Sequence, residues 1–370
     1  MSTIGVGIIG TGGIARAHMR GYGSLADRCR IAAVADIDVE RARQAAAEAG
    51  ANVKVYDDYR RLLEDGEVDL VSVCTPPFVH AEIAIAALRA GKHVLVEKPM
   101  AASLEECDAM IRAAGESGRK LAVVFQNRWR HDWQMLRAVT DSGALGRLLL
   151  GKVDLLWYRG DRYYDVWWRG TWERECGGAT INHAIHAIDG FLWLMGEPAS
   201  VYADMDALDR NIEVEDFSAA IVRFRSGAMG QITSTVLAQQ NLDRIDISGT
   251  RAGVSLPWSI YATTQREDGF PAPNPEVKAE IEAIAARVPE PRLKGHAAQI
   301  EDLLDAIESD RKPLVDGVEG RRAIELITGI YMSATLGGRV EFPLNPASPF
   351  YSTEGLRRSV KRHAKRERTA

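Results

Sequence analysis

The chain has 370 residues, of which 46% are hydrophobic and 26% are charged, and its formal net charge at pH 7 is −5. This length exceeds what one ordinary hydrophobic core accommodates, so we expect a globular protein of two domains. The acidic balance gives no electrostatic reason to expect a nucleic-acid partner.

The first part of the chain alternates short apolar strands with helices. This alternation predicts a doubly wound, parallel α/β sheet. The predicted strands cover residues 6–9, 31–35, 53–56, 70–74, 94–96 and 121–125. The predicted helices cover residues 14–25, 39–49, 57–63, 81–90 and 103–116.

After about residue 130 the pattern changes to strands in succession, which predicts an α+β domain with a mostly antiparallel sheet. Residues 225–228 look like a hairpin turn, residues 269–275 form a Pro/Gly-rich loop, and residues 296–309 have the apolar spacing of an amphipathic helix. The predicted strands cover residues 148–157, 201–206, 218–225, 229–235 and 244–248.

These patterns divide the chain into a first domain at residues 1–126, a second at 127–345 and a C-terminal extension at 346–370. From residue 357 onward the chain is rich in lysine and arginine, and its only acidic residue is Glu367. We expect a solvated or frayed end, and an oligomer or anionic contact is the alternative. The basic residues are Arg357, Arg358, Lys361, Arg362, Lys365, Arg366 and Arg368.

The cysteines and the apolar segments bear on the cellular compartment. The cysteines are scattered without CxxC spacing, which argues against a zinc knuckle or a disulfide framework and fits a reducing cytoplasm. No basic region precedes a long apolar stretch at the N-terminus, and no segment is apolar for the length of a bilayer span. We therefore predict a cytoplasmic protein without a membrane contact. The cysteines are Cys29, Cys74, Cys107 and Cys176.

A glycine-rich turn follows the first strand and opens the first helix. Residues 10–15 read Gly-Thr-Gly-Gly-Ile-Ala, the G-x-G-x-x-A form of the dinucleotide fingerprint. Gly10 allows the tight turn, and Gly12 lets the backbone approach a pyrophosphate that rests on the helix N-terminus near Gly13 and Ile14. A tight structural turn is the alternative interpretation.

An acidic residue stands where this fingerprint requires one. Asp36 ends the second strand, 24 residues after Gly12. A carboxylate there accepts hydrogen bonds from ribose hydroxyls and repels a 2′-phosphate, so NAD is favoured over NADP. A helix N-cap is the alternative role for this aspartate.

Two further segments stand at the carboxyl ends of predicted parallel strands, where ligands bind in open α/β sheets. The first is Val94 to Pro99, in which Lys98 directly follows a buried strand. The second contains Thr75, Pro76 and, a turn later, His80. A plain surface lysine and a packing histidine are the alternatives.

Together these segments resemble the Gfo/Idh/MocA oxidoreductases, which include glucose–fructose oxidoreductase and inositol dehydrogenase. The resemblance rests on residues 10–15, on Thr75 to His80 and on Glu97-Lys98-Pro99. Residues 168–169 and 177–189 resemble the second-domain motifs of the family, and the likeness extends to about Pro343.

The resemblance implies an N-terminal Rossmann domain that holds NAD and a second domain whose large open, mostly antiparallel sheet forms a homodimer or homotetramer. It implies an NAD-dependent dehydrogenase for a polyhydroxylated small molecule, a sugar, sugar derivative or cyclitol. The resemblance also implies that Lys98 and His186 are the catalytic pair and that the Lys98–Pro99 bond can be cis. The expected cofactor contacts are Gly10, Gly12, Gly13, Ile14, Asp36, Thr75, Pro76, His80, Glu97, Lys98, Asn127 and Arg169.

The chemistry of the residue types agrees with these roles. Oxidation of a secondary alcohol removes a hydroxyl proton while a hydride leaves the same carbon. An imidazole can accept that proton near neutral pH, and an ammonium can stabilise the developing alkoxide. The nicotinamide accepts the hydride, so this chemistry needs no metal.

Residues 182–189 look like one helix, with Asn182, His186 and Asp189 on one face and His183 about a quarter-turn away. A hydrogen-bonded structural histidine is the alternative to a catalytic His186. Inositol-dehydrogenase-like members carry aspartate where this chain has Asn182, so a strict Asp/His/Lys triad is weakened and we assign Asn182 to substrate positioning.

Aromatic residues and arginines gather between residues 157 and 172, which suits a site that binds a sugar ring. An interdomain or oligomer core is the alternative. We expect Tyr163, Trp168, His183 and Arg128 to contact substrate.

Two other functions stay open at this stage. One is a redox-neutral enzyme that retains NAD and uses transient oxidation to drive elimination or isomerisation. The other is a non-catalytic regulator that senses NAD and sugar, although it would have no need of an acid–base pair.

Overall fold

The computed structural model describes residues 3–363. The chain forms two compact units, one from residues Met1–Gln126 with Arg292–Ile324 and one from Asn127–Pro291 with Glu325–Ala370. Residues 292–324 thus return to the first unit. Lys365, Arg366 and Arg368 of the expected solvated end lie outside the described residues.

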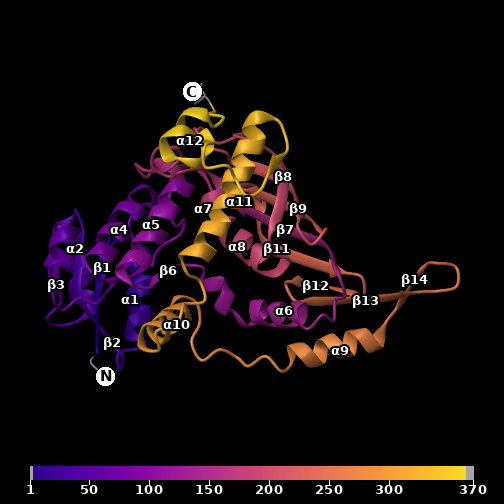
Figure 1. The fold of residues 1–370 in the computed structure, drawn as a ribbon, viewed down its shortest axis with the longest axis horizontal. Coiled ribbons are helices and arrows are strands. Elements are labelled where there is room, and N and C mark those ends of the chain that lie inside the picture. The colour runs from indigo at the N-terminus through magenta and orange to yellow at the C-terminus, as the bar shows by residue number, and fades with distance from the viewer. Residues whose placement is uncertain (1–2, 364–370) are drawn as a thin grey trace. The chain divides into compact units, whose positions relative to one another are not determined.

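The first unit is built on a six-stranded parallel sheet in the order β3-β2-β1-β4-β5-β6 (Figure 1). The strand order reverses between β1 and β4, which is the arrangement of a doubly wound fold. The predicted fold class of this part is therefore confirmed. The strands are β1 (Ile4–Ile9), β2 (Cys29–Ala35), β3 (Lys54–Tyr56), β4 (Leu70–Val73), β5 (His93–Val96) and β6 (Leu121–Val123).

The helices of this unit begin at side-chain caps in several cases. Asp38, Asp58 and Ser103 each accept a hydrogen bond from a backbone N–H in the first turn of the helix that follows. The helix that carries Ile300 packs closely on the helix that carries Gly21. A Cβ atom added at Gly21 would lie 2.6 Å from Ile300 Cδ1. The helices are α1 (Ala15–Gly23), α2 (Val39–Ala49), α3 (Tyr59–Leu63), α4 (His80–Arg89), α5 (Leu104–Ser117) and α10 (His296–Glu308), with the 3₁₀ turn η1 (Pro77–Val79).

The second unit is built on a separate nine-stranded sheet in the order β14-β13-β12-β11-β7-β10-β9-β8-β15. All neighbouring pairs are antiparallel except β7 with β10, so the predicted mostly antiparallel sheet is confirmed. The strands are β7 (Leu148–Tyr158), β8 (Pro198–Asp206), β9 (Phe217–Phe224), β10 (Met229–Thr235), β11 (Leu237–Gly249), β12 (Ala252–Leu256), β13 (Ser259–Gln265), β14 (Pro271–Pro273) and β15 (Val340–Glu341).

One face of this sheet is covered by helices. The Phe191 ring of α8 packs against Gly151 of β7 and Gly230 of β10. A Cβ atom added at these glycines would lie only 2.4 and 2.8 Å from the ring, so the missing side chains let the helix approach the sheet. The helices and turns are η2 (Gln126–Trp129), α6 (His131–Asp141), η3 (Asp161–Asp165), α7 (Ala179–Asn182), α8 (Ile185–Met195), α9 (Pro275–Ala285), η4 (Pro349–Tyr351) and α12 (Thr353–Ser359); α11 (Gly317–Leu336) runs from one unit into the other.

One expectation from the sequence was wrong. Residues 182–189 do not form one helix, because the chain breaks at His183 and Ala184 between α7 and α8. Up to His363 the basic end is solvated but not frayed. The Arg358 and Arg362 side chains are exposed, while Val360 is buried and the Lys361 ammonium donates to the Met205 carbonyl at 3.0 Å. Among the described residues, no helix is long and apolar enough to cross a membrane.

Candidate functional site

The glycine loop between β1 and α1 has the shape that a bound pyrophosphate requires. Gly10 has a φ of 85°, and a Cβ there would lie 2.8 Å from the Cys74 backbone, so no other residue fits without strain. At Gly12 and Gly13, in contrast, an added Cβ would meet nothing within 4 Å. The space beside these two residues, at the start of a helix, therefore fits an anionic dinucleotide.

Asp36 lies next to this loop. Its Oδ2 accepts hydrogen bonds from the Thr11 N–H at 2.7 Å and from the Thr11 hydroxyl at 2.9 Å. Its Oδ1 accepts the Asp38 N–H at 2.9 Å, while Arg41 Nη1 is 3.9 Å from Oδ2. The carboxylate is thus fixed at the end of β2, where the fingerprint places the acid that binds ribose hydroxyls.

The loop after β4 carries Thr75 and Pro76 and is held by His80. The His80 ring lies between two carbonyl oxygens, with Nδ1 2.8 Å from Pro99 O and Nε2 2.8 Å from Thr75 O. Burial lowers the pKa of His80, while the two carbonyl contacts act in the opposite direction. The ring links the loop after β4 to the loop after β5. Thr75 Oγ1 is a buried hydroxyl without a hydrogen-bond partner in the described structure, as expected for a group that a cofactor satisfies.

Lys98 follows β5 and forms a cis peptide bond with Pro99. The adjacent Glu97 turns its carboxylate inward: Oε1 is 2.9 Å from His18 Nε2 and 3.4 Å from His296 Nε2, while Oε2 accepts the Lys98 N–H at 3.1 Å. Burial alone would raise the pKa of Glu97, but the two histidines and the Lys98 charge hold it well below its usual range. Glu97 is therefore an ionised, buried support of the Lys98 backbone.

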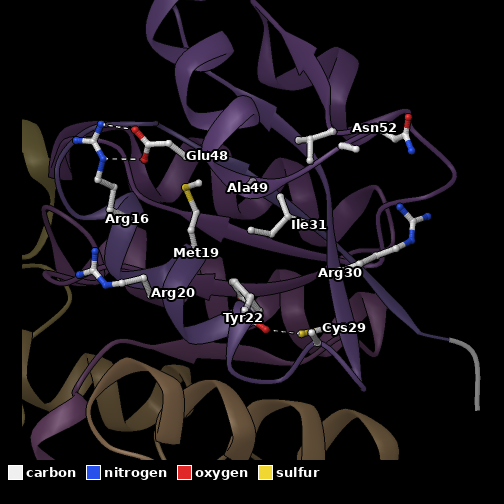
Figure 2. Close-up of a pocket in the computed structure, with 14 residues that line it drawn as sticks. Arg16, Met19, Arg20, Tyr22, Cys29, Arg30, Ile31, Glu48, Ala49 and Asn52 are labelled. Atoms are coloured by element: carbon white, nitrogen blue, oxygen red, sulfur yellow. Dashed lines mark hydrogen bonds and ion pairs between the residues drawn. The ribbon is translucent and has the colours of Figure 1, made fainter.

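A cavity of about 560 Å³ lies elsewhere in this unit, beside α1, α2 and β2. Figure 2 shows Met19 and Ile31 within it, and Arg16 of α1 paired with Glu48 of α2 at 2.9 Å. Its lining includes none of the glycine loop, Asp36 or Lys98, so it is distinct from the expected dinucleotide position.

In the second unit, the helix break separates Asn182 from His186. The Asn182 side-chain amide donates to the backbone carbonyls of Glu175, Gly177 and Gly178, with the Gly177 contact shortest at 2.8 Å. Asn182 thereby holds the loop that precedes it. His186 lies half-buried in the first turn of α8.

Arg128 lies in η2 and is buried, with 2% of its surface exposed. Its guanidinium donates two hydrogen bonds, of 2.9 and 2.6 Å, to the carboxylate of Asp189. Asp189 lies one turn of α8 after His186. The Trp193 ring lies 5.4 Å from the Arg128 guanidinium. This pair fixes the rotation of the helix that carries His186. Asn127 precedes it in the same turn and is half-buried.

Arg169 is the centre of an aromatic cluster. Its guanidinium lies 3.9 Å from the Tyr163 ring centre and 4.2 Å from that of Trp168, and it pairs with Glu175 at 2.8 Å. The His183 ring, also buried, lies 5.6 Å from Tyr163 and 5.6 Å from Trp157. Four of the residues singled out in the sequence are thus brought together: Tyr163, Trp168, Arg169 and His183.

Two buried carboxyls of this unit were missed from the sequence, and the first of them, Glu175, is the partner of Arg169. Burial raises the pKa of Glu175 to about 7, in spite of Arg169 and the Gly170 N–H. Burial also raises the pKa of Glu215, which accepts hydrogen bonds from the Gly178 and Thr180 N–H groups and the Tyr331 hydroxyl. In the sequence, the only indication for Glu175 was its place in a segment that contains aromatic residues and lies between glycines.

Sequence and structure comparisons agree with this organisation. Residues 4–125 match a family model described as an oxidoreductase family with an NAD-binding Rossmann fold, and residues 133–255 match the Gfo/Idh/MocA C-terminal domain. The D-glucoside 3-dehydrogenase of Escherichia coli is 27% identical over 360 residues, which cover 92% of this chain and 98% of that protein. The inositol 2-dehydrogenase of Salmonella typhimurium is 30% identical over 269 residues, which cover 71% and 77%.

A solved structure extends the likeness to the whole fold. The WlbA dehydrogenase from Bordetella pertussis, in complex with NADH and UDP-GlcNAcA, matches with a TM-score of 0.82 and 32% identity over 93% of this chain and 99% of that one. With both domain models matched, the chain belongs to the Gfo/Idh/MocA family of NAD-binding oxidoreductases.

Proposed function

We propose that the protein is an NAD-dependent dehydrogenase that oxidises a secondary hydroxyl of a sugar, a sugar derivative or a cyclitol. The observation that carries this proposal is Lys98, fixed at the carboxyl end of a parallel strand in the unit that also carries the glycine loop. Bound nicotinamide supplies the hydride acceptor. The relatives named as glucoside and inositol dehydrogenases support the substrate class.

NAD is the proposed cofactor, with NADP less favoured. The open space at Gly12 suits the pyrophosphate, and the unpartnered Thr75 hydroxyl offers a further polar contact. Asp36 would accept hydrogen bonds from the ribose and would repel a 2′-phosphate. The NADH in the WlbA dehydrogenase structure supports the same choice.

Lys98 and His186 are the proposed acid–base groups. The Lys98 ammonium would hydrogen-bond the substrate oxygen and stabilise its developing negative charge. His186 would hold and move the hydroxyl proton, with its helix oriented by the Arg128–Asp189 pair. Because Arg128 is buried in this pair, we propose that it positions α8, and its direct substrate contact stays a prediction.

The aromatic cluster is the proposed substrate platform. Tyr163 and Trp168 present ring faces of the kind that pack against the C–H faces of sugars. Arg169 between them is fixed by Glu175 and offers its remaining N–H groups to hydroxyl or carboxylate oxygens.

We also propose a homodimer or homotetramer formed through the face of the nine-stranded sheet that carries Tyr202, Ile221 and Leu150. Tyr202 and Ile221 are cross-strand partners on β8 and β9, and they are 53% and 51% exposed. Leu150 on β7 is 60% exposed. Exposed apolar side chains gathered on a regular sheet face are typical of an association surface.

The test is the appearance of NADH from purified protein and NAD across aldoses, uronic acids, anhydrosugars, glycosides, nucleotide sugars and inositols. A strong signal with one group is expected. Silence across the panel, with NAD binding shown separately, would overturn the dehydrogenase proposal.

A further inference from the structure

Two histidines from distant parts of the chain converge on one buried carboxylate oxygen in the first unit. His18 belongs to α1 and is fully buried, whereas His296 is the first residue of α10 and its side chain is 17% exposed. Their Nε2 atoms lie 2.9 and 3.4 Å from Glu97 Oε1, and the three donor atoms all lie within 4.8 Å of one another.

We propose that His18, Glu97 and His296 form a binding site for a divalent transition-metal ion of the zinc class. Two imidazoles and one carboxylate are a ligand set that Zn²⁺ takes readily. Ligands about 2.0–2.1 Å from a tetrahedral ion stand roughly 3.4 Å apart. The two histidine–carboxylate separations are close to that spacing, so the three donors can take up an ion with small shifts.

The surroundings of His18 allow it to change from hydrogen-bond donor to metal ligand. Its Nδ1 is 3.1 Å from the Ser72 hydroxyl, and that hydroxyl is 2.7 Å from the Tyr22 hydroxyl. Without metal, Nε2–H donates to Glu97 and Ser72 donates to Nδ1. With metal, Nδ1–H donates to the Ser72 hydroxyl oxygen. Because a hydroxyl can both donate and accept, the second ring nitrogen of His18 keeps a partner in either tautomer.

Charge and access also suit a cation. The Glu97 carboxylate is ionised, and its second oxygen is already oriented by the Lys98 N–H, which leaves Oε1 for the ion. The partly exposed His296 follows Gly295, whose φ is 60°, at the start of α10. Rotation of this one side chain would open the site to solvent, from which a water would complete the coordination. The Lys98 ammonium is the neighbouring charge that opposes a dication.

The test uses the untagged full chain after treatment with a chelator. Zn²⁺ is measured by equilibrium dialysis with metal analysis, and Co²⁺ is added to a separate sample to record its visible absorption. We expect one ion per chain in the wild type and a Co²⁺ spectrum of tetrahedral intensity. His296→Ala should weaken Zn²⁺ binding by at least about tenfold, since it removes a ligand at a partly exposed position.

His131→Ala is the matched control, because His131 Nε2 also lies near a glutamate, 3.5 Å from Glu290, and residues 3–363 offer no third donor there. It should bind Zn²⁺ like the wild type, and the thermal midpoint of each variant verifies its fold. The absence of a bound ion in the wild type, or wild-type affinity in folded His296→Ala, would show that the three residues form only a hydrogen-bonded cluster and would overturn the proposal. An absence of NADH production by the metal-free wild type, in protein that does bind Zn²⁺ when it is added, would instead count against the proposed function.

Discussion

The carboxylate of Asp36 is joined to Thr11 by two hydrogen bonds, one from the backbone N–H at 2.7 Å and one from the hydroxyl at 2.9 Å. Thr11 lies between Gly10 and Gly12, so this contact ties the end of β2 to the glycine loop. The acid proposed to select the cofactor and the loop proposed to receive its phosphates are therefore one local structure. A change in either should alter dinucleotide binding more than folding.

Asp36→Ala should weaken NADH binding by about tenfold to a hundredfold, since the lost hydrogen bonds to a charged group contribute about 1.5–3 kcal/mol. NADPH binding should weaken less or improve, because the repelling charge is gone while Arg41 stays close. Fluorescence titration with both cofactors measures the ratio. Asp58→Ala, which removes the cap of α3 instead, should leave that ratio unchanged. An unchanged ratio in Asp36→Ala would mean that Asp36 does not bind the ribose.

Gly12→Ala should separate folding from cofactor binding. A Cβ at this position meets nothing within 4 Å, so the thermal midpoint should stay within a few degrees of the wild type. The same methyl group would occupy the space proposed for the pyrophosphate, and NADH affinity should fall by at least about tenfold. Gly23→Ala, also in open space but at the end of α1, serves as the control. Normal NADH affinity in Gly12→Ala would place the phosphates elsewhere.

Local patterns in the sequence were enough to predict the two kinds of sheet and the glycine loop, because strand–helix alternation and fingerprint spacing depend on neighbouring residues. The inward turn of Glu97 could not be predicted in this way. It depends on His18 and His296, which are separated by most of the chain and meet only because α10 returns to the first unit.

The break between α7 and α8 was missed for a related reason. The periodicity of residues 182–189 is helical, but the Asn182 amide is engaged by backbone carbonyls of the preceding loop. The Ala184 N–H in turn bonds to Ala179 O, five residues back, instead of to the fourth. These backbone contacts outweigh the helical preference of residues 182–189, and the residue types of the segment do not reveal them.

Lys98→Ala should lower kcat/KM by about a hundredfold to ten-thousandfold, the usual loss when an acid–base group is removed. NAD affinity should be largely retained, because the fold of the glycine loop does not depend on this side chain. His186→Asn should show a loss of the same order. Steady-state kinetics and calorimetric titration with NAD separate turnover from binding.

Two controls make this assignment specific. Lys54→Met removes a lysine that pairs with Asp65 and Glu67 outside the proposed site, and its kcat/KM should match the wild type. His183→Asn should raise KM more than it lowers kcat, since its ring packs against Trp157 and Tyr163 at the proposed substrate platform. Unchanged kcat/KM in Lys98→Ala would refute its catalytic role.

Glu175 should make the stability of the protein depend on pH. Its folded-state pKa of about 7 lies above the ordinary value of 4.5, so the folded state binds more protons across that interval. The contribution of Glu175 to the free energy of unfolding should therefore be fully present below about pH 4.5, fall as the pH rises through about 7 and be lost above it. The size of the effect is on the order of 3 kcal/mol.

Glu175→Gln cannot titrate, so the thermal midpoint of the wild type should fall relative to this variant between about pH 5 and pH 8. Glu173→Gln changes an exposed acid two residues away and should follow the wild type at every pH. Parallel curves for wild type and Glu175→Gln would show that burial does not hold the carboxyl protonated.

Ile221→Asp should dissociate the proposed oligomer. Ile221 stands opposite Tyr202 on β8 and Gln231 on β10, in the exposed row of the nine-stranded sheet. A carboxylate buried there without a partner would cost several kcal/mol in the assembled form and little in the monomer, where the position is open to water. Light scattering coupled to size-exclusion chromatography should show the wild type as a dimer or tetramer and the variant as a smaller species. Thr264→Asp on the exposed strand β13 is the control and should keep the wild-type mass. If Ile221→Asp and the wild type have the same mass, this face does not form the interface, because an unpaired charge at its centre could not be tolerated there.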